Sequence, residues 1–168
     1  MSDKDSSSIS PSLIINQDWG INKPQTVVRI FVDTASVAAN CVNGSVSKGI
    51  YMLDNRKTLG SSGQGTLELN TCVRLNDYIG FYITPIDPTQ DDEVSIEGFE
   101  VLKGDLFGSN GYPELIKKTD KNPTGPFWIA QALNNSNTTY RLRCKLVTGG
   151  LRSRIIYFQW DPYMTVAG

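Results

Sequence analysis

The sequence predicts an all-β protein built as an antiparallel β-sandwich. Several runs alternate apolar and polar residues with a period of two, which places the apolar side chains on one face of a strand. Gly, Pro, Asn and Asp separate these runs, so about eight or nine short strands follow one another along the chain. No window of about eleven residues has the spacing of an amphipathic helix, and we therefore expect little helix.

The first predicted strands lie on both sides of a glycine-rich turn. Thr26–Asp33 is rich in β-branched residues, as a central strand would be, and Gly49–Leu53 is expected to form a shorter strand. Gly60–Gly65 has the composition of a turn. After it, Leu67 and Leu69 alternate with polar residues, which predicts the next strand.

Two further strands are predicted in the middle of the chain. Asp77–Thr84 alternates so that three large apolar side chains share one face. In Glu93–Leu102 the alternation changes parity at Gly98, because Val94 and Ile96 precede that residue and Phe99 follows it. A β-bulge at Gly98 would explain the change.

The clearest strand is Thr139–Val147. Its two faces are expected to be an apolar one with Tyr140, Leu142, Cys144 and Leu146 and a basic one with Arg141, Arg143 and Lys145. Such a strand is half-buried in an antiparallel sheet. Arg154–Trp160 follows the turn residues Gly149 and Gly150, which predicts that it pairs with Thr139–Val147 as a hairpin.

Two segments are expected to lie outside the strands. Residues 1–12 contain six Ser and, besides Met1, one large apolar residue, so we interpret them as an N-terminal arm, with a single β-sandwich domain over residues 13–168. Leu106–Pro126 contains many Gly and Pro residues and is expected to be a long loop with one helical turn at Glu114–Lys118.

Composition excludes several classes of function. The 168 residues contain no His, which removes His-based triads, zinc sites and proton relays. Three Cys without CxxC spacing favour a reducing, cytoplasmic location over a disulfide framework. A net charge of −1 gives no attraction to nucleic acid, and no apolar run is long enough for a signal peptide or a membrane span. We expect neither a cofactor nor catalytic residues.

Two clusters are candidates for ligand binding. Trp128 precedes an Asn-rich turn with Asn134, Asn135 and Asn137, and an aromatic ring beside amides is the chemistry of a carbohydrate site. Turn geometry alone also explains the asparagines. Asp91, Asp92 and Glu93 offer oxygen ligands to calcium, but neighbouring strand residues point to opposite faces, so we expect no metal there.

Charge is distributed unevenly along the chain. Asp87–Asp105 holds seven acidic residues and one Lys, whereas Arg141–Arg154 holds five basic residues and no acidic one. The two segments can contact each other between copies of the protein, with Arg141, Arg143 and Lys145 as candidate assembly residues. They can equally be neighbours in one sheet and neutralise each other within one molecule. The sequence leaves both alternatives open.

Five strings of residues together resemble the bacterial PixA/AidA inclusion-body protein family. The most distinctive is Tyr157–Val166 (YFQWDPYMTV), and the others are Val27–Thr34, Gly63–Leu67, Leu75–Ile79 and Pro126–Trp128, in matching order. The resemblance implies a β-sandwich of immunoglobulin-like architecture, and it brings no established active site. Some members of the family accumulate as crystalline inclusions in the bacterial cytoplasm.

The function expected from the resemblance is therefore non-enzymatic. We expect a bacterial protein that associates with copies of itself into ordered cytoplasmic inclusions. The alternative is a lectin-like module that binds carbohydrate through Trp128 and the Asn134–Asn137 turn, assisted by calcium. A metal-dependent melting temperature would favour the alternative.

Overall fold

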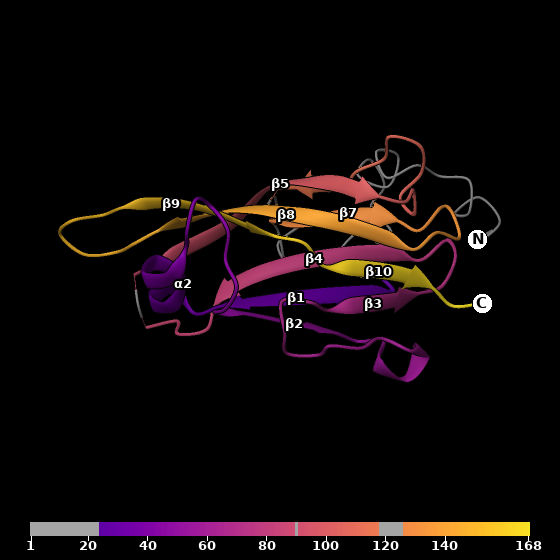
Figure 1. The fold of residues 1–168 in the computed structure, drawn as a ribbon, viewed down its shortest axis with the longest axis horizontal. Helices are drawn as coiled ribbons and strands as arrows, with labels where there is room; N and C mark the ends of the chain where they lie inside the picture. The colour runs from indigo at the N-terminus through magenta and orange to yellow at the C-terminus, as the bar shows by residue number, and fades with distance from the viewer. Residues whose placement is uncertain (1–23, 90, 118–125) are drawn as a thin grey trace.

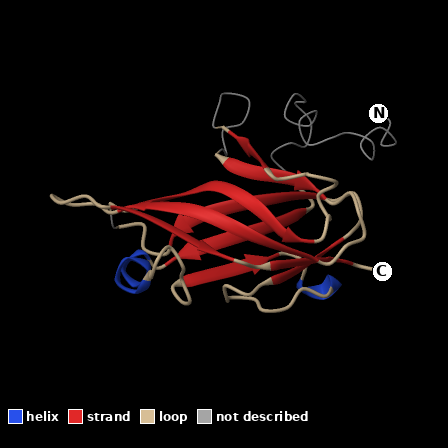
Figure 2. Cartoon of the chain, turned by 45° about the horizontal axis from the view of Figure 1, so that its top comes forward, coloured by secondary structure: helices blue, strands red, loops and turns tan. Residues whose placement is uncertain are grey.

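The structure consists mostly of strands in two layers. It is a computed structural model that describes residues 24–89, 91–117 and 126–168, so the predicted arm at residues 1–12 lies outside the described part. Figure 1 shows the order of the elements and Figure 2 shows how little of the chain is helical. The elements are β1 (Thr26–Val32), α2 (Thr34–Asn40), β2 (Ile50–Asp54), the 3₁₀ helix η2 (Lys57–Leu59), β3 (Asn70–Val73), β4 (Tyr78–Pro85), β5 (Glu93–Lys103), β6 (Glu114–Ile116), β7 (Phe127–Gln131), β8 (Thr138–Val147), β9 (Ile155–Trp160) and β10 (Tyr163–Val166).

Within the described residues, these strands form two sheets. Sheet A has the order β2-β1-β4-β7-β6, and sheet B has the order β3-β10-β8-β5 with β9 also paired to β8. The prediction of an all-β sandwich is confirmed, and its immunoglobulin-like detail stays a prediction. No helix in the described part of the chain is long and apolar enough to cross a membrane.

The prediction that both sheets are purely antiparallel is wrong. Sheet A contains the parallel pair β1 and β4, and sheet B contains the parallel pair β3 and β10. The partners of each pair are far apart along the chain, as parallel strands must be. Alternation within a strand defines its faces but not the direction of its neighbour, which explains the error.

A short helix that the sequence analysis did not predict follows β1. Asp33 caps α2, since its carboxylate accepts a hydrogen bond from the Ser36 backbone N–H at 3.1 Å. Alanine at positions 35, 38 and 39 favours the helix. With seven residues, α2 is too short for a periodic apolar pattern to identify it.

The helical turn predicted at Glu114–Lys118 is wrong. Residues Glu114–Ile116 form β6, an edge strand that pairs with β7 through Ile116 and Phe127, while Lys118 lies outside the described residues. Pairing with a neighbouring strand outweighs the local preference for helix.

The core lies between the two sheets and confirms the predicted faces. Tyr140, Leu142, Cys144 and Leu146 on β8 are all at most 1% exposed. The register of β5 against β8 shifts between Ile96 and Gly98, so the predicted bulge is present and Phe99 can join the core. Burial of these side chains supplies most of the stability of the fold.

Stability is expected to fall above pH 9 because the core holds two groups that ionise poorly. Burial raises the pKa of Cys144 above 9.0 and that of Tyr140 above 10.0, and burial also raises the pKa of Tyr78 and Tyr82. The unfolded chain therefore releases protons at a lower pH than the native one. Each fully buried group should cost about 1.4 kcal/mol per pH unit above its ordinary pKa. Urea unfolding at pH 7, 10 and 11 measures this slope.

The variant Tyr140→Phe isolates one of these groups. Within the described residues the Tyr140 hydroxyl has no hydrogen-bond partner, so removing it should cost less than about 1 kcal/mol at pH 7. The loss of stability above pH 10 should become less steep. Tyr51→Phe, at a ring that is 42% exposed, is the matched control and should leave the slope unchanged. A loss of several kcal/mol at pH 7 would instead mean that the Tyr140 hydroxyl is bonded.

Candidate functional site

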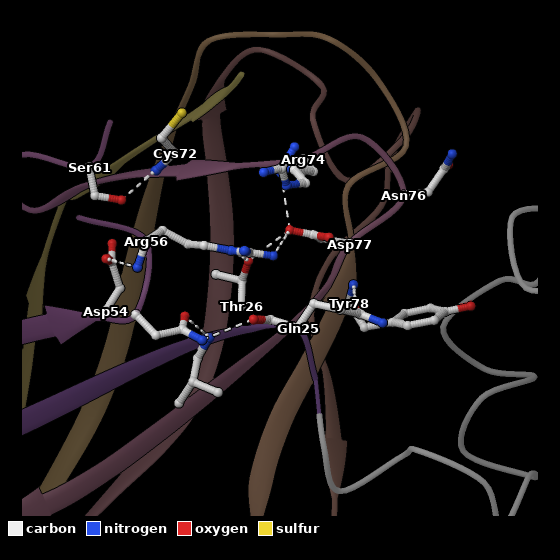
Figure 3. A network of polar contacts seen from close by, with 12 residues as sticks. Gln25, Thr26, Asp54, Arg56, Ser61, Cys72, Arg74, Asn76, Asp77 and Tyr78 are labelled. Atoms are coloured by element: carbon white, nitrogen blue, oxygen red, sulfur yellow. Dashed lines mark hydrogen bonds and ion pairs between the residues drawn. The ribbon is translucent and has the colours of Figure 1, made fainter. Parts of the chain in front are cut away.

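A buried polar network joins three segments at one end of sheet A (Figure 3). Arg56, which precedes η2, forms an ion pair with Asp77 at 2.5 Å, and their side chains are 18% and 9% exposed. The Thr26 hydroxyl donates to the Asp77 carboxylate at 3.0 Å and accepts from the Arg56 Nε at 2.9 Å. The Arg74 backbone N–H donates to the same carboxylate oxygen at 3.0 Å.

The local sequence places Asp77 at the turn between β3 and β4. Asn76 has a φ of 74°, which Asn tolerates better than most residues, and the Asp77 N–H closes the turn on the Arg74 carbonyl at 3.0 Å. The network thus ties the start of β1 and the segment around Arg56 to this turn. The donors and acceptors of the network are hydrogen-bonded to one another, and we therefore interpret the network as a structural cross-link.

This network is not recognisable in the amino-acid sequence. Its three side chains come from positions 26, 56 and 77, and no spacing along the chain relates them. The one local signal was the Asn76–Asp77 pair at the opening of a strand. Only the fold brings Arg56 to it.

The basic residues of β8 form ion pairs within the chain. Arg141 donates from its Nε to Asp161 at 2.8 Å, and this bond is the main reason that the pKa of Arg141 is raised. Arg143 contacts Glu100 at 2.7 Å. Lys145 is paired more loosely, with its Nζ 3.9 Å from Glu97.

Of the two alternatives for the charged segments, the structure therefore has the intramolecular one. β5 and β8 are antiparallel neighbours, so acidic and basic side chains alternate across the outer face of sheet B. Arg143 keeps the most exposed side chain of the three, at 55%. A role of Arg141, Arg143 and Lys145 in assembly stays a prediction.

The acidic run at the start of β5 has a structural task. Asp92 accepts a hydrogen bond from the Thr34 hydroxyl at 2.5 Å and from the Gly149 N–H at 2.7 Å. It thereby joins the start of α2 to the β8–β9 turn. Asp91 packs against Gly149, and Glu93 is exposed. In the described part of the chain, no group of three or more metal-ligating side chains is arranged to hold an ion.

The structure does not bring Trp128 and the Asn-rich turn together. Trp128 lies on the inner face of β7, packs against Phe99 at 5.4 Å between ring centroids, and lines a cavity of about 360 Å³. Asn134 donates to the Asp105 carbonyl at 3.0 Å, and the Asn137 backbone lies against Gly104. Trp128 thus contacts the middle of β5, whereas the Asn-rich turn contacts the residues that follow the strand. A carbohydrate role for Trp128, Asn134, Asn135 and Asn137 stays a prediction without a shared pocket.

A second hollow lies on the outer face of sheet B and was not identified from the sequence. It has a volume of about 270 Å³, and the side chains around it include Tyr157 and Gln159 of β9, Arg143 of β8 and Glu97 of β5. Asn43 forms its rim. The alternation of residues along β9 is enough to predict that Tyr157 and Gln159 share one face. The other residues of the hollow come from neighbouring strands, whose pairing the alternation does not predict.

Comparison with known proteins gives a matching family and several related solved structures, one of which is described below. The family described as "Domain of unknown function (DUF8788)" matches residues 24–153. Among curated proteins, none matches significantly. The crystal structure of an inclusion body protein, PixA, from Burkholderia cenocepacia J2315 has a TM-score of 0.68 and 16% sequence identity. The match covers 84% of this chain and 94% of that one. The two share a fold, and the resemblance to the PixA/AidA family is confirmed at that level.

Proposed function

We propose that this chain, which belongs to the family described as domain of unknown function DUF8788, is a non-enzymatic protein of the inclusion-body type that associates with copies of itself into ordered cytoplasmic inclusions. The fold shared with the PixA inclusion body protein supports this type. A sequence without His, in which no cofactor motif was recognised, supports a role other than catalysis.

The observation that carries the proposal is the exposed edge of β9. An edge strand with free backbone groups is a template for pairing with another chain. The other edges of the described sheets are protected: the pairing of β5 has two register shifts, β6 has three residues, and β2 and β3 are bridged by Thr66 and Ser62. β9 is bridged at Gln159, and its Tyr157 carbonyl accepts a hydrogen bond from the Cys41 thiol at 3.7 Å, but from Ile155 to Tyr157 no described strand pairs with its other side.

Two of the exposed side chains at this edge are large and apolar. The β8–β9 hairpin projects beyond the body of the protein (Figure 1). Leu151 at its turn is fully exposed, and Ile155 on β9 is 61% exposed. Because the charged side chains of β8 are paired within the chain, assembly is expected to depend on backbone pairing and on these apolar contacts. It should therefore persist at high salt, which screens exposed ion pairs.

Substitutions at the hairpin test the proposal. Light scattering of the wild-type protein over a range of concentrations should detect particles larger than a monomer, at both low and high salt. The double variant Leu151→Asp/Ile155→Lys should remain monomeric, because charges on an edge strand oppose pairing. Leu75→Lys, at a leucine that is 49% exposed between β3 and β4, is the matched control and should assemble like the wild type.

The outcomes distinguish whether the protein assembles at all from whether β9 is the contact through which it assembles. Monomers at every concentration, together with expressing cells that contain no ordered bodies, would overturn the proposed function. Assembly that survives Leu151→Asp/Ile155→Lys would leave the function in place and reject β9 as the contact. The candidate role of the basic face is tested by Arg143→Gln, which removes the most exposed of its charges.

A further inference from the structure

The hollow on the outer face of sheet B combines an exposed aromatic ring with polar side chains from three strands. The Tyr157 side chain is on the outer face of β9, and the residue is 61% exposed. On the neighbouring strand β8, Lys145 lies opposite Tyr157, and Arg143 lies opposite Gln159. Glu97 occupies the bulge of β5, between the paired residues Ile96 and Gly98.

A tight turn holds one wall of the hollow in place. Asn43 and Gly44 have φ values of 51° and 82°, the conformation of a two-residue hairpin turn between Val42 and Ser45. The Gln159 N–H donates to the Gly44 carbonyl at 2.8 Å. The turn is thereby fastened to β9, so Asn43 has a defined position beside the strand.

Three polar groups at the hollow are free to bind a ligand. Within the described residues, the side-chain amides of Asn43 and Gln159 and the hydroxyl of Tyr157 make no hydrogen bond. Each of them can both donate and accept. Since Asn43, Gln159 and Tyr157 line the same hollow, the amides can bind hydroxyl groups of a molecule that stacks on the Tyr157 ring.

The charges of the site favour a neutral ligand. Arg143 is paired with Glu100 at 2.7 Å and Lys145 lies 3.9 Å from Glu97, so the charged groups around the hollow are balanced. An anion or a cation would have to compete with these pairs. A neutral ligand that carries several hydroxyl groups does not.

We propose that this hollow binds a neutral saccharide, with the Tyr157 ring against the apolar face of a sugar and the amides of Asn43 and Gln159 on its hydroxyl groups. The site is separate from Trp128 and the Asn134–Asn137 turn, and it goes beyond the proposed function because it does not depend on assembly. The preference for aromatic and planar polar side chains in ligand sites is general.

The test is an array of neutral and of sialylated or sulfated glycans, with saturation-transfer NMR on methyl glycosides of glucose, galactose, mannose and N-acetylglucosamine. The wild type should bind at least one neutral sugar and show no preference for the charged ones. Tyr157→Ala and Gln159→Ala should each weaken binding about tenfold or more. Tyr51→Ala, at another exposed tyrosine that lies on β2 of the other sheet, should leave binding unchanged.

Two controls keep the result interpretable. Thermal melting establishes that each variant folds. Gln159→Ala retains the backbone hydrogen bonds of residue 159, so of the two substitutions it should affect the stability of the fold less. The variant Leu151→Asp/Ile155→Lys should still bind sugar, which separates this site from assembly. The proposal would be overturned if the wild type bound no neutral sugar on the array or in the NMR experiment. It would also be overturned if binding survived both Tyr157→Ala and Gln159→Ala.

Discussion

Replacing Asp77 with alanine is expected to lower the free energy of unfolding by about 3–5 kcal/mol, the cost of leaving a buried partner charge uncompensated. Asp77 is 9% exposed at its side chain and accepts hydrogen bonds from Arg56, Thr26 and the Arg74 backbone. Without it, the Arg56 guanidinium stays in the interior with Thr26 as its remaining partner in the network. Urea unfolding at pH 7 measures the loss.

Two comparisons distinguish this ion pair from an ordinary one. Glu100→Ala removes a carboxylate that also contacts arginines but is 42% exposed, and it should cost under about 1 kcal/mol. The double variant Arg56→Met/Asp77→Leu removes both charges and should recover most of the stability that Asp77→Ala loses. If Asp77→Ala and Glu100→Ala cost the same, the network is not the cross-link that we infer.

Replacing Leu142 with alanine is expected to cost about 2–5 kcal/mol, because the side chain is fully buried and its removal leaves a cavity. Leu142 lies in the middle of β8, opposite Phe99 of β5 on one side and Trp160 of β9 on the other. Large neighbours on both sides limit how far the core can collapse into the gap. The measurement is again the free energy of unfolding in urea.

The adjacent residue supplies the control. Arg143→Ala changes a side chain that is 55% exposed and paired with Glu100, and it should cost under about 1 kcal/mol. Similar losses from the two substitutions would contradict the assignment of the two faces of β8.

The sequence allowed most strands and their faces to be predicted. Thr139–Val147 was expected to be a half-buried strand, and β8 occupies Thr138–Val147 with the expected face buried. The parity change in Glu93–Leu102 likewise predicted the bulge of β5 next to Gly98. Both features follow from the alternation of side chains along a strand, which is a local property.

The sites could be predicted far less well. The sequence indicated Trp128 together with the Asn134–Asn137 turn, yet Trp128 packs against the middle of β5 and the turn lies beside Gly104, after the strand. The hollow around Tyr157 and the network around Asp77 each combine residues from at least three separate segments. Such groupings depend on which strands become neighbours.

The sequence by itself determined the all-β class, the strand faces and the β8–β9 hairpin, because a period of two and a glycine-rich turn act over a few residues. Only the tertiary structure decided that β1 pairs in parallel with β4 and that β5 lies beside β8. That second choice neutralises the acidic and basic segments within one molecule. The pairing of distant strands is selected by the packing of the whole core, so no local sequence pattern predicts it.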